Sequence, residues 1–266
     1  MTEILSTLDL GVPWALYALV CLAFSAEAVT GFGATVITVT LGAQLLPLEQ
    51  LLPIYVPANV VLSLLMVRTQ RRHIDRAWLG RHLLPLVGLG MAAGLLLFRL
   101  LRPGPSMLIG YAGLVLLLAV WELYRQKHQP VSDVAAPADP QSRPSQAAMA
   151  ALVAGGFIHG IYGSGGPLLV WASSQRLTEK AKLRATLAAT WAILGAVLIA
   201  QYASMDLLTR RSLVVSATLL PMVWLAQRVG NYLHTIVSES AFRRLVYWLL
   251  LAAASSLLLR TALSSY

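Results

Sequence analysis

The sequence predicts an all-α polytopic membrane protein made of two inverted repeats, each a broken, re-entrant helical hairpin followed by three transmembrane helices. Three observations predict this fold class. First, 58% of the 266 residues are hydrophobic and only 12% are charged, whereas about a quarter of the residues in a soluble domain are charged. Second, apolar runs of membrane-spanning length, about 18 residues, recur along the whole chain. Third, the two halves of the chain resemble each other.

The similarity between the halves is clearest around two glycine-rich stretches. The segment TGFGATVITV (30–39) aligns with YGSGGPLLVW (162–171) at an offset of 132 residues, which places Glu27 over His159. Farther along, PLVGLGMAAG aligns with PMVWLAQRVG at an offset of 136. Two blocks in the same order at nearly the same offset indicate a duplication, and internal repeats are common in transporter folds.

The first half is expected to form a broken hairpin and three further helices. The run from Pro13 to Leu46 is 34 residues long, and a straight helix of that length would measure about 50 Å against a hydrocarbon core of about 30 Å. Its natural break is TGFG, because glycine permits a positive φ and lowers helix stability by about 1 kcal/mol. The apolar runs predict helices over Pro13–Thr30, Ala34–Leu46, Leu51–Val67, Leu83–Leu101 and Met107–Tyr124.

The second half is expected to repeat this order. Its break is YGSGGP, and Pro167 suits the first position of the next helix, where the missing N–H costs nothing. The predicted helices are Ala147–Ile161, Pro167–Ser174, Ala185–Tyr202, Leu213–Ile236 and Phe242–Leu259. Between the halves, Arg125–Gln146 contains four prolines and no apolar periodicity, which is typical of a flexible linker. The expected domains are a first membrane repeat (1–124), this linker (125–146) and a second membrane repeat (147–266).

The net charge of +9 is interpreted as a topological signal rather than as a nucleic-acid-binding surface, because the basic residues lie in short loops between apolar runs. If each glycine stretch turns back within the membrane, 15 of the 20 Lys and Arg residues face the cytoplasm; if each belongs to one crossing, only 11 do. The first arrangement is favoured, and it makes the halves inverted. The choice between crossing and turning back stays open at this point.

The two glycine turns are expected to face each other near the middle of the membrane. Irregular backbone at that depth is tolerated only against protein or a watery cavity. New helices begin directly after the turns, at about Ala34 and Gly166. Unpaired N–H groups and the helix dipole at such N-termini favour an anion.

Two ionisable residues at corresponding positions are the leading candidates for the site. Glu27 is a carboxylate at membrane depth, which is costly unless it is paired, protonated or hydrated. His159 is suited to hydrogen-bonding an anion or to carrying a proton near neutral pH. Two alternatives remain open: Glu27 caps backbone groups or lies near the headgroups, and His159 is a satisfied core residue.

Further substrate-binding candidates lie in the turns and on neighbouring helices. The glycines would form the turns, or else pack helices closely. The hydroxyl and amide groups would line the site, or else join helices. Arg228 would attract the anion, or else extend to the membrane surface. The set is Thr30, Gly31, Phe32, Gly33, Ala34, Asn59, Tyr162, Gly163, Ser164, Gly165, Gly166, Thr190 and Arg228.

At these residues the chain resembles the TauE/SafE family of sulfite and organosulfonate exporters. The first half reads GFGATVITVTLGAQLLP and then VPANVVLSLLMVRTQRRHIDRAWL, the second reads GGFIHGIYGSGGPLLVWA, and FRRLVYWLLL resembles the family's closing segment. The resemblance covers nearly the whole chain apart from the linker. It implies transport of small anions, often sulfite, sulfoacetate or related sulfur compounds. The chain departs from the family in having GFGA where many members have a richer glycine run such as GIGGG.

The sequence therefore predicts a secondary transporter that exports a small organic or sulfur oxyanion across the cytoplasmic (inner) membrane. Proton coupling through Glu27 or His159 is a further hypothesis. The expected partners are the anion and the lipid bilayer, with no cofactor, metal or nucleic acid, and the oligomeric state is not fixed. Two alternatives come from other classes. One is an intramembrane serine enzyme, although Tyr162 stands where such enzymes have glycine; the other is a non-transporting structural or receptor-like membrane protein.

Overall fold

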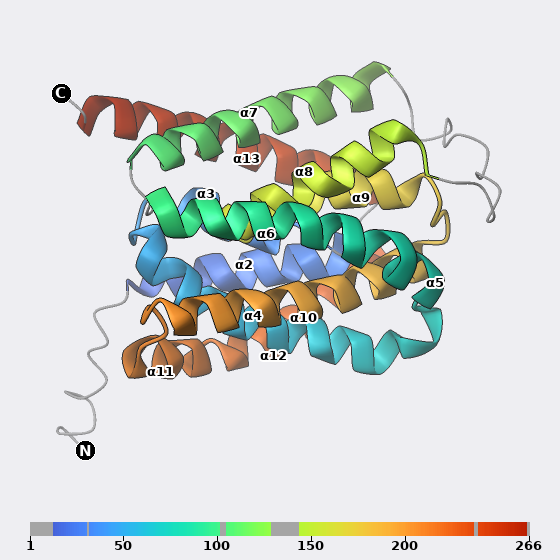
Figure 1. Ribbon diagram of the computed structural model, residues 1–266, viewed down its shortest axis with the longest axis horizontal. Helices are drawn as coiled ribbons and strands as arrows, with labels where there is room; N and C mark the ends of the chain where they lie inside the picture. The colour runs from blue at the N-terminus through green and yellow to red at the C-terminus, as the bar shows by residue number, and fades with distance from the viewer. Residues whose placement is uncertain (1–12, 31, 102–104, 129–143, 237–238, 265–266) are drawn as a thin grey trace.

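The computed structural model describes residues 13–30, 32–101, 105–128, 144–236 and 239–264, and within them the chain forms helices joined by turns (Figure 1). The first half contains α2 (Trp14–Thr30), α3 (Ala34–Gly42), α4 (Leu48–Gln70), α5 (Arg76–Trp78), α6 (Leu84–Leu101) and α7 (Pro105–His128). The second half contains α8 (Gln146–Tyr162), α9 (Gly166–Ser174), α10 (Lys180–Ser204), α11 (Arg210–Thr218), α12 (Leu220–Ile236) and α13 (Glu239–Ser264). A 3-10 turn, η1 (Arg71–His73), and a π-helical turn, η2 (Leu79–Leu83), lie between α4 and α6.

Five stretches of the described residues are long and apolar enough to cross a membrane, by length and composition. They are Leu48–His73, Arg76–Leu100, Met107–Tyr124, Lys180–Ser204 and Arg210–Val229, and shorter apolar helices cover Trp14–Val29, Gln146–Tyr162 and Arg244–Leu259. Large apolar side chains, among them Leu89 (67% exposed) and Leu117 (69%), lie on the outside of the bundle. A surface of this kind suits lipid rather than water. The predicted all-helical, polytopic membrane class is confirmed.

Both glycine breaks fold the chain back on itself. Gly42, the last residue of α3, lies close to the beginning of α2, because a Cβ built on it would be 3.6 Å from Leu19 Cδ2. In one straight helix these two residues would be about 35 Å apart. Gly155 of α8 likewise lies against Leu168 and Leu169 of α9. Helices α2 and α3 therefore form one hairpin, and α8 and α9 form another.

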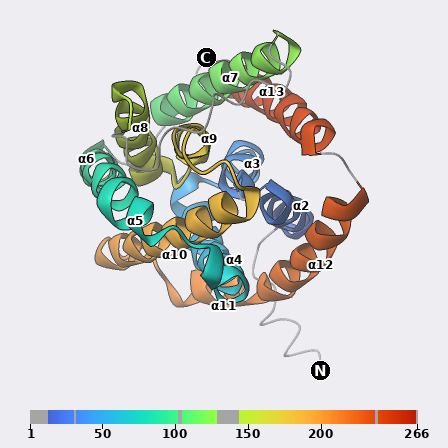
Figure 2. The same cartoon turned by 90° about the vertical axis from the view of Figure 1, so that its right-hand side faces the viewer.

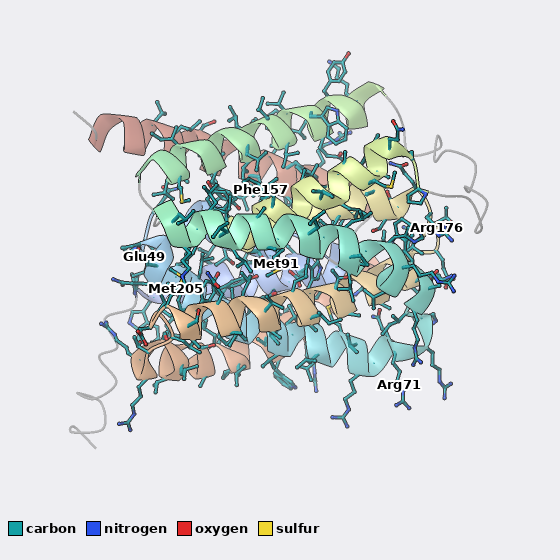
Figure 3. The ribbon with its side chains drawn as sticks, viewed as in Figure 1. Glu49, Arg71, Met91, Phe157, Arg176 and Met205 are labelled. Carbon is teal, nitrogen blue, oxygen red and sulfur yellow. The ribbon has the colours of Figure 1, made fainter. Side chains whose placement is uncertain are left out.

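The two hairpins have opposite orientations: the chain leaves them at opposite ends of the bundle. Glu49, which soon follows the first hairpin, lies at the left end in Figure 3, and Arg176, which directly follows the second, lies at the right end. Helix α4 runs from the Glu49 end toward Arg71 on the right, and α10 runs the opposite way to Met205 on the left. Viewed along the bundle, α3 and α9 lie near the centre, with α6, α7, α10, α12 and α13 around them (Figure 2).

The helix bounds recur at the offset found in the sequence. A shift of 132 residues turns the bounds of α2 and α3 into those of α8 and α9, and the start of α4 into the start of α10. The same shift places Asn59 of α4 over Trp191 of α10. Between the halves, α7 continues to His128 and α8 begins at Gln146; residues 129–143 of the predicted linker lie outside the described residues.

The prediction of one continuous helix over Leu213–Ile236 is wrong. Helix α11 ends at Thr218 and α12 begins at Leu220. Pro221 explains the interruption, because proline has no N–H for the intrahelical hydrogen bond and its ring clashes with the carbonyl of the residue four positions earlier, Ala217.

The two halves are interleaved rather than placed side by side. Helix α6 packs on α8, α12 on α2, α4 on α10 and α7 on α13, so each of these pairs joins the first half to the second. Glycines four residues apart line the seam between α6 and α8: Gly90, Gly94, Gly156 and Gly160. A Cβ built on Gly90 would lie 1.9 Å from the carbonyl oxygen of Val153. Small residues allow this close approach between membrane helices.

Polar contacts also join the halves at the end of the bundle marked by Arg71. The Asp75 carboxylate accepts the Trp78 backbone N–H (2.9 Å) and pairs with Lys182 (3.1 Å), and the Asp75 backbone N–H donates to Thr186 Oγ1 (3.0 Å). Burial acts to raise the pKa of Asp75, but the Trp78 N–H and the Lys182 ammonium outweigh it and hold that pKa below its usual value.

We expect Lys182→Met to lower the melting temperature at neutral pH and to have no effect in strong acid. The lowered pKa means that ionised Asp75 stabilises the fold above its unfolded pKa of about 3.9, and that this stabilisation is lost as the pH falls through the folded pKa. Because the pair is partly exposed, the effect should stay below about 1 kcal/mol. Melting curves of both proteins in detergent across this pH range check the prediction, and a difference that persists in strong acid would contradict it.

Candidate functional site

The two hairpin breaks meet at a cavity inside the bundle. The first half lines it with Glu27, Gly33, Thr35, Val36 and Asn59, and the second half with His159, Gly163, Ser164, Gly166 and Trp191. About 20 Å³ is open to the centres of water molecules, which is room for about one or two waters. The lining residues include a carboxyl and an imidazole but no lysine or arginine.

Glu27 is 3% exposed and lies between α2, α3 and α4. The Asn59 side-chain nitrogen is 3.4 Å and 3.5 Å from its two carboxylate oxygens, and also donates to the Tyr55 hydroxyl at 3.0 Å. The backbone N–H of Ala34, the first residue of α3, interacts favourably with the same carboxylate. Glu27 therefore lies at the N-terminus of the helix that follows it in its own hairpin, where the helix dipole favours negative charge, and it also faces the cavity.

His159 is 5% exposed, and its imidazole is positioned by an aromatic side chain rather than by hydrogen bonds. Its imidazole stacks on Trp191, with ring centroids 5.6 Å apart and an interplanar angle of 27°. Among the described residues, neither ring nitrogen has a hydrogen-bond partner. A buried polar atom left in this state costs about 1–3 kcal/mol. No protein group among the described residues therefore satisfies the imidazole, and its place in the cavity wall suits a water or a ligand.

The glycines of the two breaks are required for different reasons. Gly33, which precedes α3, has φ +102°, and Gly163, which ends α8, has φ +65° and donates its N–H to the His159 carbonyl at 2.7 Å. Side chains strain both conformations. Gly165 has an ordinary φ of −95°, but a Cβ there would lie 2.0 Å from the Gly155 carbonyl oxygen. The aligned glycines Gly33 and Gly165 thus have different backbone conformations.

Two predicted residues lie beside the second break and bind to α7. The Tyr162 hydroxyl donates to the Met107 carbonyl at 2.8 Å, and the Tyr111 hydroxyl donates to Ser164 Oγ at 3.0 Å. The Tyr111 and Tyr162 rings are 4.6 Å apart. Helix α7 therefore supports the turn, while Ser164 contributes to the cavity wall.

The predicted residues around the first break lie in different surroundings. Phe32 is buried, and a Cβ built on Gly166 would be 3.7 Å from its side chain, so it lies between the two hairpins. Ala34 starts α3 and is buried. Gly31 and the Thr30 side chain lie outside the described residues.

Two other candidates are not in the cavity wall. The Thr190 hydroxyl is buried and donates to the Thr186 carbonyl within α10 at 2.9 Å, which is the role of a residue that supports a helix. Arg228 is exposed, and its guanidinium lies 4.4 Å from the centre of the Trp224 ring. This surface position agrees with the alternative that Arg228 extends toward the membrane surface.

Three residues of the cavity wall were not predicted from the sequence. Trp191 occupies the position of Asn59 at the offset of 132 residues, so extending the repeat alignment into α10 would have found it. Thr35 follows the first break directly, and its hydroxyl is 3.4 Å from the Tyr55 hydroxyl. Val36 carries no chemical signal that would separate it from the other apolar residues of α3.

A further missed residue lies next to the first hairpin. Arg184 in the first turns of α10 donates from its guanidinium to the carbonyl of Ala28, in the last turn of α2. The last carbonyls of a helix have no intrahelical partner, and a cation is favoured there. Its only sequence signal was a positive charge near a loop, yet it ties the tip of the first hairpin to the second half.

The site is suited to binding a small hydrogen-bond acceptor. Its wall combines the unpartnered His159 nitrogens with the N-terminal turns of α3 and α9, where backbone N–H groups favour negative charge. In the part of the chain that the structure describes, no group of three or more His, Cys, Asp or Glu residues could hold a metal ion.

A polytopic bundle with a buried polar cavity between two broken hairpins is an arrangement typical of membrane transporters. A family model described as "Sulfite exporter TauE/SafE" matches residues 16–257, which include both hairpins. The chain belongs to the TauE/SafE family, whose members are transporters of sulfite and organosulfonates and not enzymes. No curated protein and no solved structure matches the chain.

Proposed function

We propose that the protein is a secondary transporter that exports a small anion, such as sulfite, sulfoacetate or a related organic anion, across the inner membrane. The observation that carries this proposal is the cavity shared by the two hairpin breaks. It offers the N-terminus of α9 and an imidazole whose nitrogens have no hydrogen-bond partner among the described residues, and these groups bind an anion without needing a permanent side-chain cation.

The proposed architecture is two inverted repeats, residues 1–124 and 147–266, joined by a linker over 125–146. The recurring helix bounds and the opposite openings of the two hairpins support it. The basic residues support placing the Arg71 and Arg176 end in the cytoplasm. Labelling of a cysteine introduced near Arg176 in a Cys21→Ser background tests the placement, and reaction with an impermeant reagent from outside intact cells would contradict it.

The cavity has room for about one or two waters, so passage of an anion as large as sulfoacetate requires the hairpins to move apart. Each hairpin is packed on a helix of the other half, α8 on α6 and α2 on α12. Rocking of one sequence half against the other, the simplest expectation for a repeat transporter, would break both contacts. The proposed moving units are instead each hairpin together with the helix on which it packs.

Proton coupling at Glu27 is the second part of the proposal. An anion and an ionised carboxylate in one small cavity repel each other, strongly so away from water. Protonation of Glu27 as the anion enters would remove this repulsion, and one proton would then accompany each anion. His159 is the other proton-carrying candidate in the wall.

The proposal predicts anion flux that follows a pH gradient in proteoliposomes. Purified protein is expected to carry labelled sulfite or sulfoacetate at a rate above that of protein-free liposomes, with chloride as a comparison anion. Glu27→Gln is expected to lose the dependence on the pH gradient. No flux of any anion would contradict the transporter proposal, and an unchanged pH response in Glu27→Gln would contradict coupling at Glu27 alone.

A further inference from the structure

Equivalent positions of the two hairpins carry opposite chemistry. In the first hairpin, the Glu27 carboxylate of α2 interacts with the backbone N–H of Ala34, which begins α3. In the second hairpin, the residue at the same position of α8 is His159, which cannot supply a negative charge. The first helix N-terminus thus has an anion of its own, and the second has none from the corresponding position.

The N-terminus of α9 is open to a ligand. Gly165 precedes it and provides no side-chain cap. Within the first turn, Pro167 has no N–H, so the backbone donors are those of Gly166 and Leu168. Gly166 lies in the cavity wall and has no side chain to cover its N–H.

The two aligned residues on α4 and α10 hold these groups in different ways. Asn59 contacts Glu27 with its side-chain amide, whereas Trp191 stacks on the face of His159. Stacking orients the imidazole, and within the part of the chain that the structure describes neither ring nitrogen has a hydrogen-bond partner. Trp191 is therefore a positioning residue that presents His159 to the cavity.

We propose that the substrate's oxyanion group binds at the second hairpin, against the N-terminus of α9 and a ring nitrogen of His159, in the place that the Glu27 carboxylate takes in the first. The ligand class is a sulfite, sulfonate or carboxylate group, whose oxygens accept from the Gly166 N–H and the imidazole N–H. The site is therefore asymmetric, with a built-in carboxylate on one side and the transported anion on the other. This inference rests on the proposed function and adds where and by what the anion is held.

Substituting His159 with glutamate tests the inference directly. A carboxylate at residue 159 would reproduce the first hairpin, cap α9 and exclude the ligand, so His159→Glu is expected to bind neither sulfoacetate nor sulfite. His159→Gln keeps a donor and should weaken binding about tenfold, the loss expected when a strong hydrogen bond to a charged ligand is exchanged for a weaker one. Trp191→Leu should weaken binding similarly, and Trp191→Phe, which keeps a stacking ring, should restore most of it.

The measurement is calorimetric titration of purified protein in detergent, with elution volume and melting temperature as checks on folding. His82→Glu and His82→Gln are matched controls, because His82 stacks on Trp78 and is absent from the cavity wall; their dissociation constants should equal that of the wild type. Wild-type affinity in folded His159→Glu would overturn the inference. If that variant does not fold, wild-type affinity in His159→Gln would do so. Absence of binding and flux in the wild-type protein would instead contradict the proposed function.

Discussion

Gly90→Ala is expected to destabilise the protein, even though alanine forms helices better than glycine. A Cβ at this position would lie 1.9 Å from the carbonyl oxygen and 2.8 Å from the carbonyl carbon of Val153. These are backbone atoms of α8, so no side-chain rotation can relieve the clash, and α6 must move away from α8. Overpacking costs about 1–3 kcal/mol, and we expect the upper part of that range.

Gly88→Ala is the matched control for this prediction. Gly88 lies on the same helix two residues earlier, and no atom would approach within 4 Å of a Cβ built there. Alanine is favoured over glycine in a helix by about 1 kcal/mol, so this variant should be as stable as the wild type or more so. Unfolding of both variants in detergent measures the difference, and equal stability would show that α6 and α8 do not pack as closely as described.

Arg184→Gln is expected to lower both stability and transport. The substitution removes the guanidinium that donates to the Ala28 carbonyl, and losing a hydrogen bond to a charged group costs about 1.5–3 kcal/mol. Ala28 is the neighbour of Glu27 in α2, so a loosened helix end should also disturb the position of the carboxylate. Melting temperature and the rate of sulfoacetate flux in proteoliposomes measure the two effects.

Two further variants, Arg184→Lys and Lys127→Gln, distinguish the effect of losing a positive charge from the effect of losing the guanidinium hydrogen bond. Lysine keeps the positive charge beside the end of α2 but not the planar guanidinium, so it should restore part of the stability. Lys127 is exposed near the end of α7, and its replacement removes a cation without touching a hairpin. A loss in Lys127→Gln equal to that in Arg184→Gln would contradict a specific role for Arg184.

The local signals in the sequence were sufficient to predict most helices and both breaks. The glycine stretches end α2 at Thr30 and begin α9 at Gly166, close to the predicted positions, because glycine and proline act on the backbone within a few residues. The repeat alignment brought Glu27 and His159 to equivalent positions, and both lie in the cavity wall. That part of the candidate site could be predicted because the sequences around the two glycine stretches align at a constant offset.

Which distant helices pack on each other could not be predicted from the sequence in the same way. The spacing of Gly90 and Gly94 on α6, and of Gly156 and Gly160 on α8, is visible in the sequence, but every apolar helix offers several faces and several partners. Arg184 illustrates the same limit, since a hydrogen bond to the Ala28 carbonyl involves a backbone atom that carries no sequence signal. Arg228 was singled out by its charge alone, and charge does not determine whether a residue faces the cavity or the surface.

The packing of α12 on α2 has a consequence for the synthesis of this protein. Helix α12 leaves the ribosome about 200 residues after the first hairpin has been made. Throughout that interval α2 lacks the helix on which it packs, and the broken backbone of the hairpin lies at a depth where lipid offers no hydrogen-bond partner. The insertion machinery must therefore shelter the hairpin until the last helices arrive, and chains that terminate before α12 are expected to be removed by membrane proteases rather than to persist as a stable half.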